Sequence, residues 1–148
     1  DVVHAPGHAP HQVVFHDRTD DVLFSGDAGG IRPEGADDLF PTSPPVNFDL
    51  AGCIADAETI AERNPDRICF GHFGDAAFSP DLMGEYEGVL TEWVERVREK
   101  RAELGDDDAV IEHFAGTADP IEPWGERKTR AEHRLNAKGV LGYLDQQD

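Results

Sequence analysis

"QVVFHDRTDDVLFSGDAGG", residues 12–30, decides the fold of this 148-residue chain. Two runs rich in β-branched and aromatic residues, 12–17 and 22–26, flank a polar turn, and this pattern predicts a β-hairpin. A similar run at 1–5 predicts a strand before the hairpin, separated from it by a turn rich in Pro and Gly. The first part of the chain is therefore predicted to build a small β-sheet.

Helical periodicity takes over after residue 47. Apolar residues recur at helical spacing behind Asp49, a residue type that caps helices, and Asn64-Pro65 predicts the end of that helix. A long amphipathic segment and two shorter ones follow. The elements predicted after the hairpin are a helix between Asp49 and Asn64, a strand at 67–70, and helices at 81–104, 107–115 and 129–147. This order predicts an α+β fold in which helices cover a sheet.

The segment between the hairpin and the first helix, residues 28–47, follows neither the period of a strand nor that of a helix. It is rich in Gly and Pro and is predicted to be a long loop. Long loops inside compact domains are usually functional or disordered.

The composition is strongly acidic, with 31 Asp and Glu against 13 Lys and Arg and a net charge of −18. A nucleic-acid groove needs a basic surface, so nucleic acid is not an expected partner. Because 39% of the residues are hydrophobic and fall into periodic segments, the chain is predicted to fold despite its charge. Ten Arg against three Lys and the acidic excess favour a protein of a salt-adapted cytoplasm, where ions screen self-repulsion. No apolar run approaches the ~20 residues of a membrane span.

The two cysteines, Cys53 and Cys69, are too few for a disulfide framework and do not form a CxxC pair. Free cysteines are among the residues most often buried in protein interiors. Both are therefore predicted to be buried free thiols.

Three candidate metal ligands follow predicted strands: His8 in "PGHAP", Asp27 in "SGDAGG" and His72 in "FGHFG". Each lies next to Gly, which allows the close backbone approach that a crowded site needs. Two imidazoles and a carboxylate that converge from three strand ends would suit a hard or borderline divalent metal ion. Each residue alone has an ordinary structural explanation, and the three together favour a metal centre.

These segments, "HAPGHAPHQVVF", "VLFSGDAGG" and "CFGHFG", resemble the second half of the metallo-β-lactamase fold hydrolases. In that family a "PGH" loop supplies a His ligand to one metal ion, a "GD" loop supplies an Asp that bridges both ions, and a late His completes the second ion. The resemblance gives these roles to His8, Asp27 and His72. Asp27 is thereby the expected catalytic residue of this chain.

The defining "HxHxDH" motif of the family is absent from this sequence, and it normally lies before the "PGH" loop. The resemblance therefore implies half of an αββα sandwich, with a helical C-terminal extension. Residues 1–80 are assigned to the C-terminal part of the metallo-β-lactamase-like domain and residues 81–148 to the helical segment. We expect the chain to be the C-terminal part of a larger enzyme, with the N-terminal half of the same protein as its partner.

The activity implied by the resemblance is metal-assisted hydrolysis of a small-molecule substrate. Two zinc ions, or iron in their place, would lie about 3.5–4 Å apart and lower the pKa of a water molecule between them. The ending "GHFG" and the loop "PPVNFDL" are most similar to hydrolases related to glyoxalase II. Thioester or other ester hydrolysis is the expected reaction.

The other histidines are predicted to have lesser roles. His4 and His11 are expected to support His8 or to face the substrate, because the sequence continues as "PGHAPHQ" where family members often have "PGHTxGH". His16, His113 and His133 lie outside the constellation and are expected to face solvent.

Two alternatives stay open at this stage. The first is a non-catalytic acidic interaction domain or an inactive fragment. Such a chain would bind a partner, or a second copy of itself, through the sheet edge left by the missing half. An iron-dependent redox enzyme on the same scaffold is the other alternative, because His and Asp ligands suit iron as well as zinc.

Overall fold

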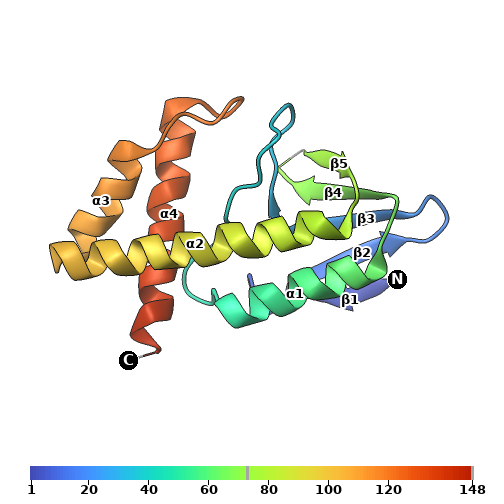
Figure 1. The fold of residues 1–148 in the computed structure, drawn as a ribbon, viewed down its shortest axis with the longest axis horizontal. Helices are drawn as coiled ribbons and strands as arrows, with labels where there is room; N and C mark the ends of the chain where they lie inside the picture. The colour runs from blue at the N-terminus through green and yellow to red at the C-terminus, as the bar shows by residue number, and fades with distance from the viewer. Residues whose placement is uncertain (73, 148) are drawn as a thin grey trace.

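A computed structural model describes residues 1–72 and 74–147 as one five-stranded sheet and four helices (Figure 1). The strands are β1 (Val2–His4), β2 (Val13–Asp17), β3 (Val22–Ile31), β4 (Arg67–Gly71) and β5 (Asp75–Ala77). The helices are α1 (Leu50–Arg63), α2 (Pro80–Leu104), α3 (Asp107–Thr117) and α4 (Gly125–Asp145). The α+β class predicted from the sequence is confirmed.

The strands lie in the sheet in their order along the chain, from β1 to β5. All neighbours are antiparallel except β3 and β4, which are parallel and are joined by the crossover through α1. Since β2 runs against both β1 and β3, the strands β1, β3 and β4 all point the same way. Their carboxyl ends therefore meet at one edge of the sheet, where His8 follows β1, His72 follows β4, and Asp27 lies in the second half of β3.

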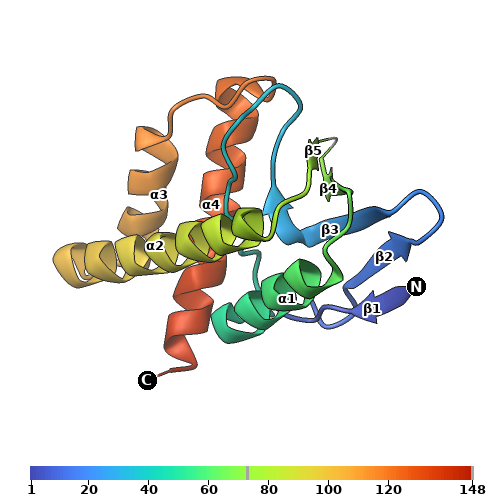
Figure 2. The same cartoon turned by 45° about the vertical axis from the view of Figure 1, so that its right-hand side comes forward.

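Helices α1 and α2 cover one face of the sheet, and the two views agree on this arrangement (Figures 1 and 2). The core lies between these layers, where the side chains of Val14, Leu23 and Ile68 have no exposed surface. The helices contribute Ile60 and Leu90, which are also fully buried. Burial of this apolar area is the main stabilising contribution to the fold.

The opposite face of the sheet carries large apolar side chains in the open. Val2 is 66% exposed, Phe15 is 52% exposed and Phe24 is 47% exposed. Strand register pairs Val2 with Phe15, Phe15 with Phe24, and Phe24 with Cys69. These four residues, here called the outer ladder, form one row across β1 to β4. A contiguous apolar row of this kind is typical of a surface that another layer covers.

Helices α3 and α4 pack against each other and against the C-terminal part of α2, at the end away from the sheet (Figure 1). Buried residues from Ala5 to Leu144 belong to one continuous hydrophobic core. That core crosses the division predicted at residue 80, and the division itself stays a prediction. In the part of the chain that the structure describes, no helix is long and apolar enough to cross a membrane.

Strand β3 is longer than the sequence predicted, because it continues through the glycines that were assigned to the loop. Gly30 has a φ of +85°, and a Cβ there would lie 2.5 Å from the ring of Tyr86. These glycines keep the strand close to α2 while its register with β4 shifts between Phe24 and Ile31. The loop then covers residues 32–49, interrupted by an isolated bridge between Ile31 and Phe40.

Three smaller expectations were wrong. No strand was predicted where β5 lies, because its residues, "DAA", carry no β-branched or aromatic side chain. Helix α4 begins at Gly125, four residues before the predicted start. His16 is only 4% exposed rather than solvent-facing, because β2 points it to the helix-covered face, where its Nε2 lies 2.8 Å from Asp21 Oδ1. His113 and His133 are half-buried.

Candidate metal centre

The three predicted ligands come together at one edge of the sheet. The Nε2 atom of His8 lies 3.5 Å from Oδ2 of Asp27, and Nε2 of His72 lies 3.3 Å from Oδ1 of the same carboxylate. Asp27 therefore stands between two imidazoles, with one oxygen toward each. The side chains of His8, Asp27 and His72 are 12%, 29% and 35% exposed, so the cluster is accessible from one side.

Glycine is required where β3 and β4 bring Asp27 beside the loop of His72. A Cβ at Gly71 would lie 2.6 Å from Oδ1 of Asp27, which is too close for any other residue. Gly26, next to the aspartate, has a φ of +54° and pairs with Phe70 across the parallel ladder. The glycines of the "GD" and "GH" segments thus permit the contact that the sequence predicted.

His8 is held from its other side by Thr42. The Nδ1 atom of His8 lies 3.3 Å from the hydroxyl oxygen of Thr42, which is itself buried. Burial lowers the pKa of His8, and the neighbouring Asp27 carboxylate opposes this shift. A histidine must be neutral to bind a metal ion, so burial prepares His8 for ligation, while the contact with Thr42 orients its ring.

The loop that carries Thr42 is fastened to α2 and α4 by buried hydrogen bonds. The Ser43 N–H donates to Oδ1 of Asn136 at 2.7 Å, and the Ser43 hydroxyl donates to the Asn136 carbonyl oxygen at 2.9 Å. The indole N–H of Trp93 donates to the same hydroxyl at 3.0 Å. A Cβ at Gly139 would lie 1.7 Å from the Ser43 carbonyl oxygen, so the loop packs directly on the backbone of α4. The segment around Thr42 is therefore held in place by both helices.

His72 borders a cavity of about 310 Å³, and residues around the start of α4 line its other side. Its ring centroid lies 5.8 Å from that of Trp124, and the two planes are tilted by 59°. The Nζ atom of Lys128 lies 4.7 Å above the Trp124 ring. Glu34 and Pro123 complete the lining. The volume is at the lower end of the range of small-molecule pockets.

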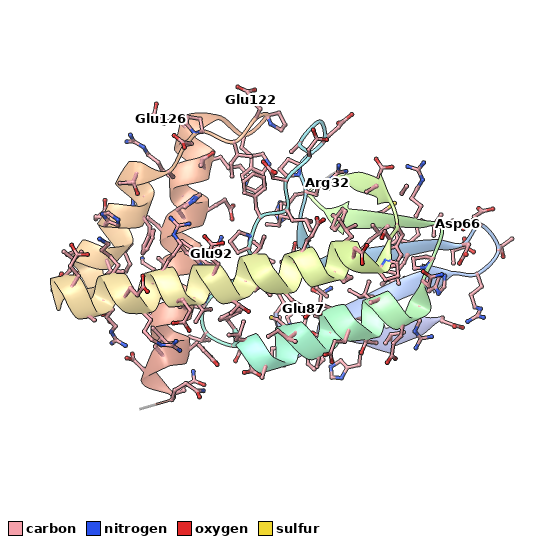
Figure 3. All side chains as sticks on the ribbon, viewed as in Figure 1. Arg32, Asp66, Glu87, Glu92, Glu122 and Glu126 are labelled. Carbon is pink, nitrogen blue, oxygen red and sulfur yellow. The ribbon has the colours of Figure 1, made fainter. Side chains whose placement is uncertain are left out.

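Charged side chains lie near this cavity, and the long loop carries one of them, Arg32. Arg32, at the start of that loop, donates a hydrogen bond to the Asp75 carbonyl oxygen at 2.9 Å and so ties the loop to β5. Figure 3 shows Arg32 on this loop and shows Glu122 and Glu126 around the start of α4. The lining of the cavity itself carries one negative and one positive side chain, Glu34 and Lys128.

His4 and His11 lie in the "PGH" segment but outside the cluster. The exposed His4 has its Nε2 atom 2.8 Å from the Pro10 carbonyl oxygen, so it braces the loop. His11 is exposed, and it lies close enough to lower the pKa of His8 slightly through its charge. Whether either residue faces the substrate stays a prediction.

The cysteines are both free, as predicted, and only Cys53 is fully buried. Burial raises the pKa of the Cys53 thiol to about 12. Cys69 is half-buried on the outer face of the sheet. Neither is assigned to the candidate centre.

Sequence reasoning missed Thr42 and Trp124. Thr42 lies in a loop without periodicity, and its contact with His8 depends on how α4 fixes that loop. The only available signal was the length of the loop, which had indicated a functional segment. Trp124 lies between the helices predicted at 107–115 and 129–147, where the sequence analysis placed no functional residue.

The three donors are arranged as two nitrogen–oxygen pairs around one carboxylate. Considering residues 1–72 and 74–147 only, no group of three or more His, Cys, Asp or Glu side chains could hold a metal ion. The two imidazoles face different oxygens of Asp27, so each oxygen has one nitrogen donor beside it. Nitrogen and carboxylate donors suit zinc and iron. Each position would still need ligands from outside this set.

Comparisons with known proteins agree with this geometry. The sequence model of the metallo-beta-lactamase superfamily matches residues 1–72, the segment that holds His8, Asp27 and His72. A search among curated protein sequences gave no match.

Two solved structures share the fold of the whole chain. An archaeal metallo-beta-lactamase superfamily protein from Sulfolobus tokodaii is 21% identical with a TM-score of 0.57, and the match covers 97% of this chain and 45% of that protein. A metallo-beta-lactamase family protein from Thermus thermophilus is 18% identical with a TM-score of 0.57, covering 99% of this chain and 44% of that protein. This chain thus spans less than half the length of either structure. The family model supports the predicted resemblance over residues 1–72, the solved structures support the fold, and the glyoxalase II-like branch stays a prediction.

Proposed function

We propose that this chain supplies part of the metal centre of a metal-dependent hydrolase of the metallo-β-lactamase superfamily. The observation that carries the proposal is the position of Asp27, with each carboxylate oxygen 3.3–3.5 Å from a different imidazole. A carboxylate in this position can bridge two ions, each with one histidine ligand. The match of the superfamily to residues 1–72 supports the same assignment.

His8, Asp27 and His72 would hold the ions, and zinc is the first candidate with iron as the other. When bound, such ions act as Lewis acids and lower the pKa of water toward neutrality. Thr42 keeps the His8 ring in one orientation through its contact with Nδ1. Burial keeps His8 neutral and so available as a nitrogen donor.

The proposed substrate is a small thioester or another ester. The cavity of about 310 Å³ beside His72 supports a small-molecule substrate, because Trp124 offers it an aromatic wall and Lys128 a positive charge. The net charge of −18 disfavours RNA as a substrate. The same acidic excess supports a salt-adapted cytoplasm as the proposed environment.

The remaining ligands would come from a partner, and the N-terminal half of the same protein is our proposed source. Matches that cover 44–45% of the solved structures support this, since those proteins have room for a second half. The outer ladder gives such a half an apolar surface on which to pack.

The test is metal content together with intact mass, measured on the protein purified from its native source in high salt. About two zinc or iron ions per molecule and a mass above 16.2 kDa would support a complete hydrolase. Hydrolysis of a panel of thioesters and esters, lost in Asp27→Asn and kept in Asp37→Asn, would support the reaction. A metal-free protein with the mass of these residues alone would contradict the proposal.

A non-catalytic interaction domain is the second candidate, and the exposed outer ladder is the observation that favours it. Such a domain would bind a partner or a second copy of itself through this face. Sedimentation of the 148-residue chain alone tests self-association. A concentration-dependent dimer that is lost in Phe15→Ser/Phe24→Ser, with no bound metal, would favour the interaction domain over the hydrolase.

A further inference from the structure

Gly7, immediately before His8, lies in direct contact with the backbone of α1. A Cβ at this position would lie 2.1 Å from the Cys53 nitrogen and 2.6 Å from its Cα atom. No side chain can occupy that space, because the neighbouring atoms belong to a helix backbone that cannot yield. The "PGH" loop therefore rests on the first turns of α1 at one defined point.

Both backbone polar groups of Gly7 bind this region of α1. The Gly7 N–H donates to Oδ2 of Asp56 at 2.7 Å in a buried hydrogen bond, and its carbonyl oxygen accepts from the Asp49 N–H at 3.1 Å. Asp49 is the N-cap of the helix, so the second contact lies at its first turn. Together the two bonds fix the plane and direction of the chain just before His8.

Asp56 is unusual for the buried face of a helix, since it is only 5% exposed. Burial raises the pKa of its carboxyl group, and the hydrogen bond from Gly7 opposes that shift. Buried carboxyl groups are costly unless they accept hydrogen bonds. A charge-assisted bond to a loop N–H accounts for this residue, whereas packing alone would favour an apolar side chain.

We propose that Asp56 is a positioning residue that fixes the "PGH" loop on α1 and thereby aims the His8 imidazole at Asp27. The position of His8 is then fixed twice. Asp56 fixes the preceding backbone through Gly7, and Thr42 contacts the Nδ1 atom of the ring. The part of this inference that concerns a metal ligand rests on the proposed function. The part that concerns the loop does not.

The loop is tested first on the metal-free 148-residue chain by NMR. In Asp56→Ala we expect at least tenfold faster exchange of the Gly7 amide and loss of the nuclear Overhauser contact between His8 and Thr42. Asp56→Asn keeps an acceptor and should retain Gly7 protection. Glu58→Ala removes an exposed acid from the same helix and should leave both signals unchanged. Should Asp56→Ala not fold, Asp56→Ser replaces it with the same expectation.

Gly7 exchange within twofold of the unsubstituted chain would overturn the inference. So would an equal rise at Gly7 and at the Val94 amide in the core of α2, because that would mean general destabilisation. Spectroscopic titration with Co²⁺, on each variant combined with the proposed N-terminal half, then tests the metal role, and we expect 10–100-fold weaker binding in Asp56→Ala than in Glu58→Ala. Loss of Gly7 protection without any Co²⁺ binding by the unsubstituted combined protein would contradict the proposed function and uphold the positioning of the loop.

Discussion

The two faces of the sheet are built from similar side chains and have opposite surroundings. On the inner face Val14, Leu23 and Ile68 are fully buried under α1 and α2, whereas on the outer face Phe15 and Phe24 are about half exposed. The hydrophobic effect alone would bury both rows. The difference teaches that, within the part of the chain that the structure describes, helices cover only the inner face of the sheet.

Truncation of one residue on each face should show the largest difference between the two faces. Leu23→Ala leaves a cavity beneath the helices and should lower the free energy of unfolding by about 2–5 kcal/mol. Phe24→Ala, the next residue on the opposite face, should cost less than about 1 kcal/mol because its ring is half in water. Urea unfolding of both variants measures the difference. Equal losses would mean that the outer face is already covered in solution.

The next largest difference is expected in the reactivity of the two thiols, one on the outer face of the sheet and one in a helix that covers the inner face. Cys69 belongs to the outer ladder, and Cys53 is buried in α1 with a pKa of about 12. With iodoacetamide at neutral pH, Cys69 should react on the order of 100-fold faster than Cys53. Mass spectrometry of the peptides over time measures both rates. In urea the two rates should converge, and a native Cys53 that reacts as fast as Cys69 would contradict the packing of α1.

Substitution of the outer ladder should change surface properties more than stability. Phe15→Ser/Phe24→Ser should lower binding of a fluorescent hydrophobic dye several-fold, while the unfolding midpoint stays nearly unchanged. The matched control is Val46→Ser, since Val46 is also exposed but lies in the loop. Dye binding that falls equally in the control would mean that the ladder is not a distinct apolar surface.

The smallest effect concerns Asp56, a charged group on the covered side. Because burial raises the pKa of its carboxyl group, the folded chain holds this proton more tightly than the unfolded chain. Stability contributed by this group should therefore fall as pH rises from the ordinary pKa of a carboxyl group to the raised one. Unfolding free energies of the chain and of Asp56→Asn, compared between pH 3 and 7, measure this. The difference should shift in favour of the variant as pH rises, and a shift the other way would contradict the buried carboxylate.

Most of the elements could be predicted from local patterns, because each of them has its own period. The three predicted ligands could also be predicted, since each follows a strand and sits beside a glycine. Their meeting depends on β1, β3 and β4 running in one direction, which the order of strands and helices already favoured. The contacts of His8 and His72 with the two oxygens of Asp27 agree with that reasoning.

The remainder depends on tertiary contacts that no local pattern carries. The glycines of β3 have the composition of a loop. The strand continues through them, and the ring of Tyr86 leaves no room for a side chain at Gly30. His16 alternates with Val14 on the buried face, a period of two that was applied to the apolar residues and not to the histidine. Thr42 reaches His8 only because Ser43 is bonded to Asn136, 93 residues further along the chain. Such distant pairs have no signature in a single sequence.

These distant pairs also determine when the centre can form during folding. The bond between Gly7 and Asp56 closes a separation of 49 residues, and the one between Ser43 and Asn136 closes 93. Each closure costs chain entropy before its contact is gained, so contacts of this range form late. Local helices can appear early, but His8 acquires its final orientation only after both ends of the chain have docked. Occupancy of the centre would therefore act as a check that this chain has finished folding.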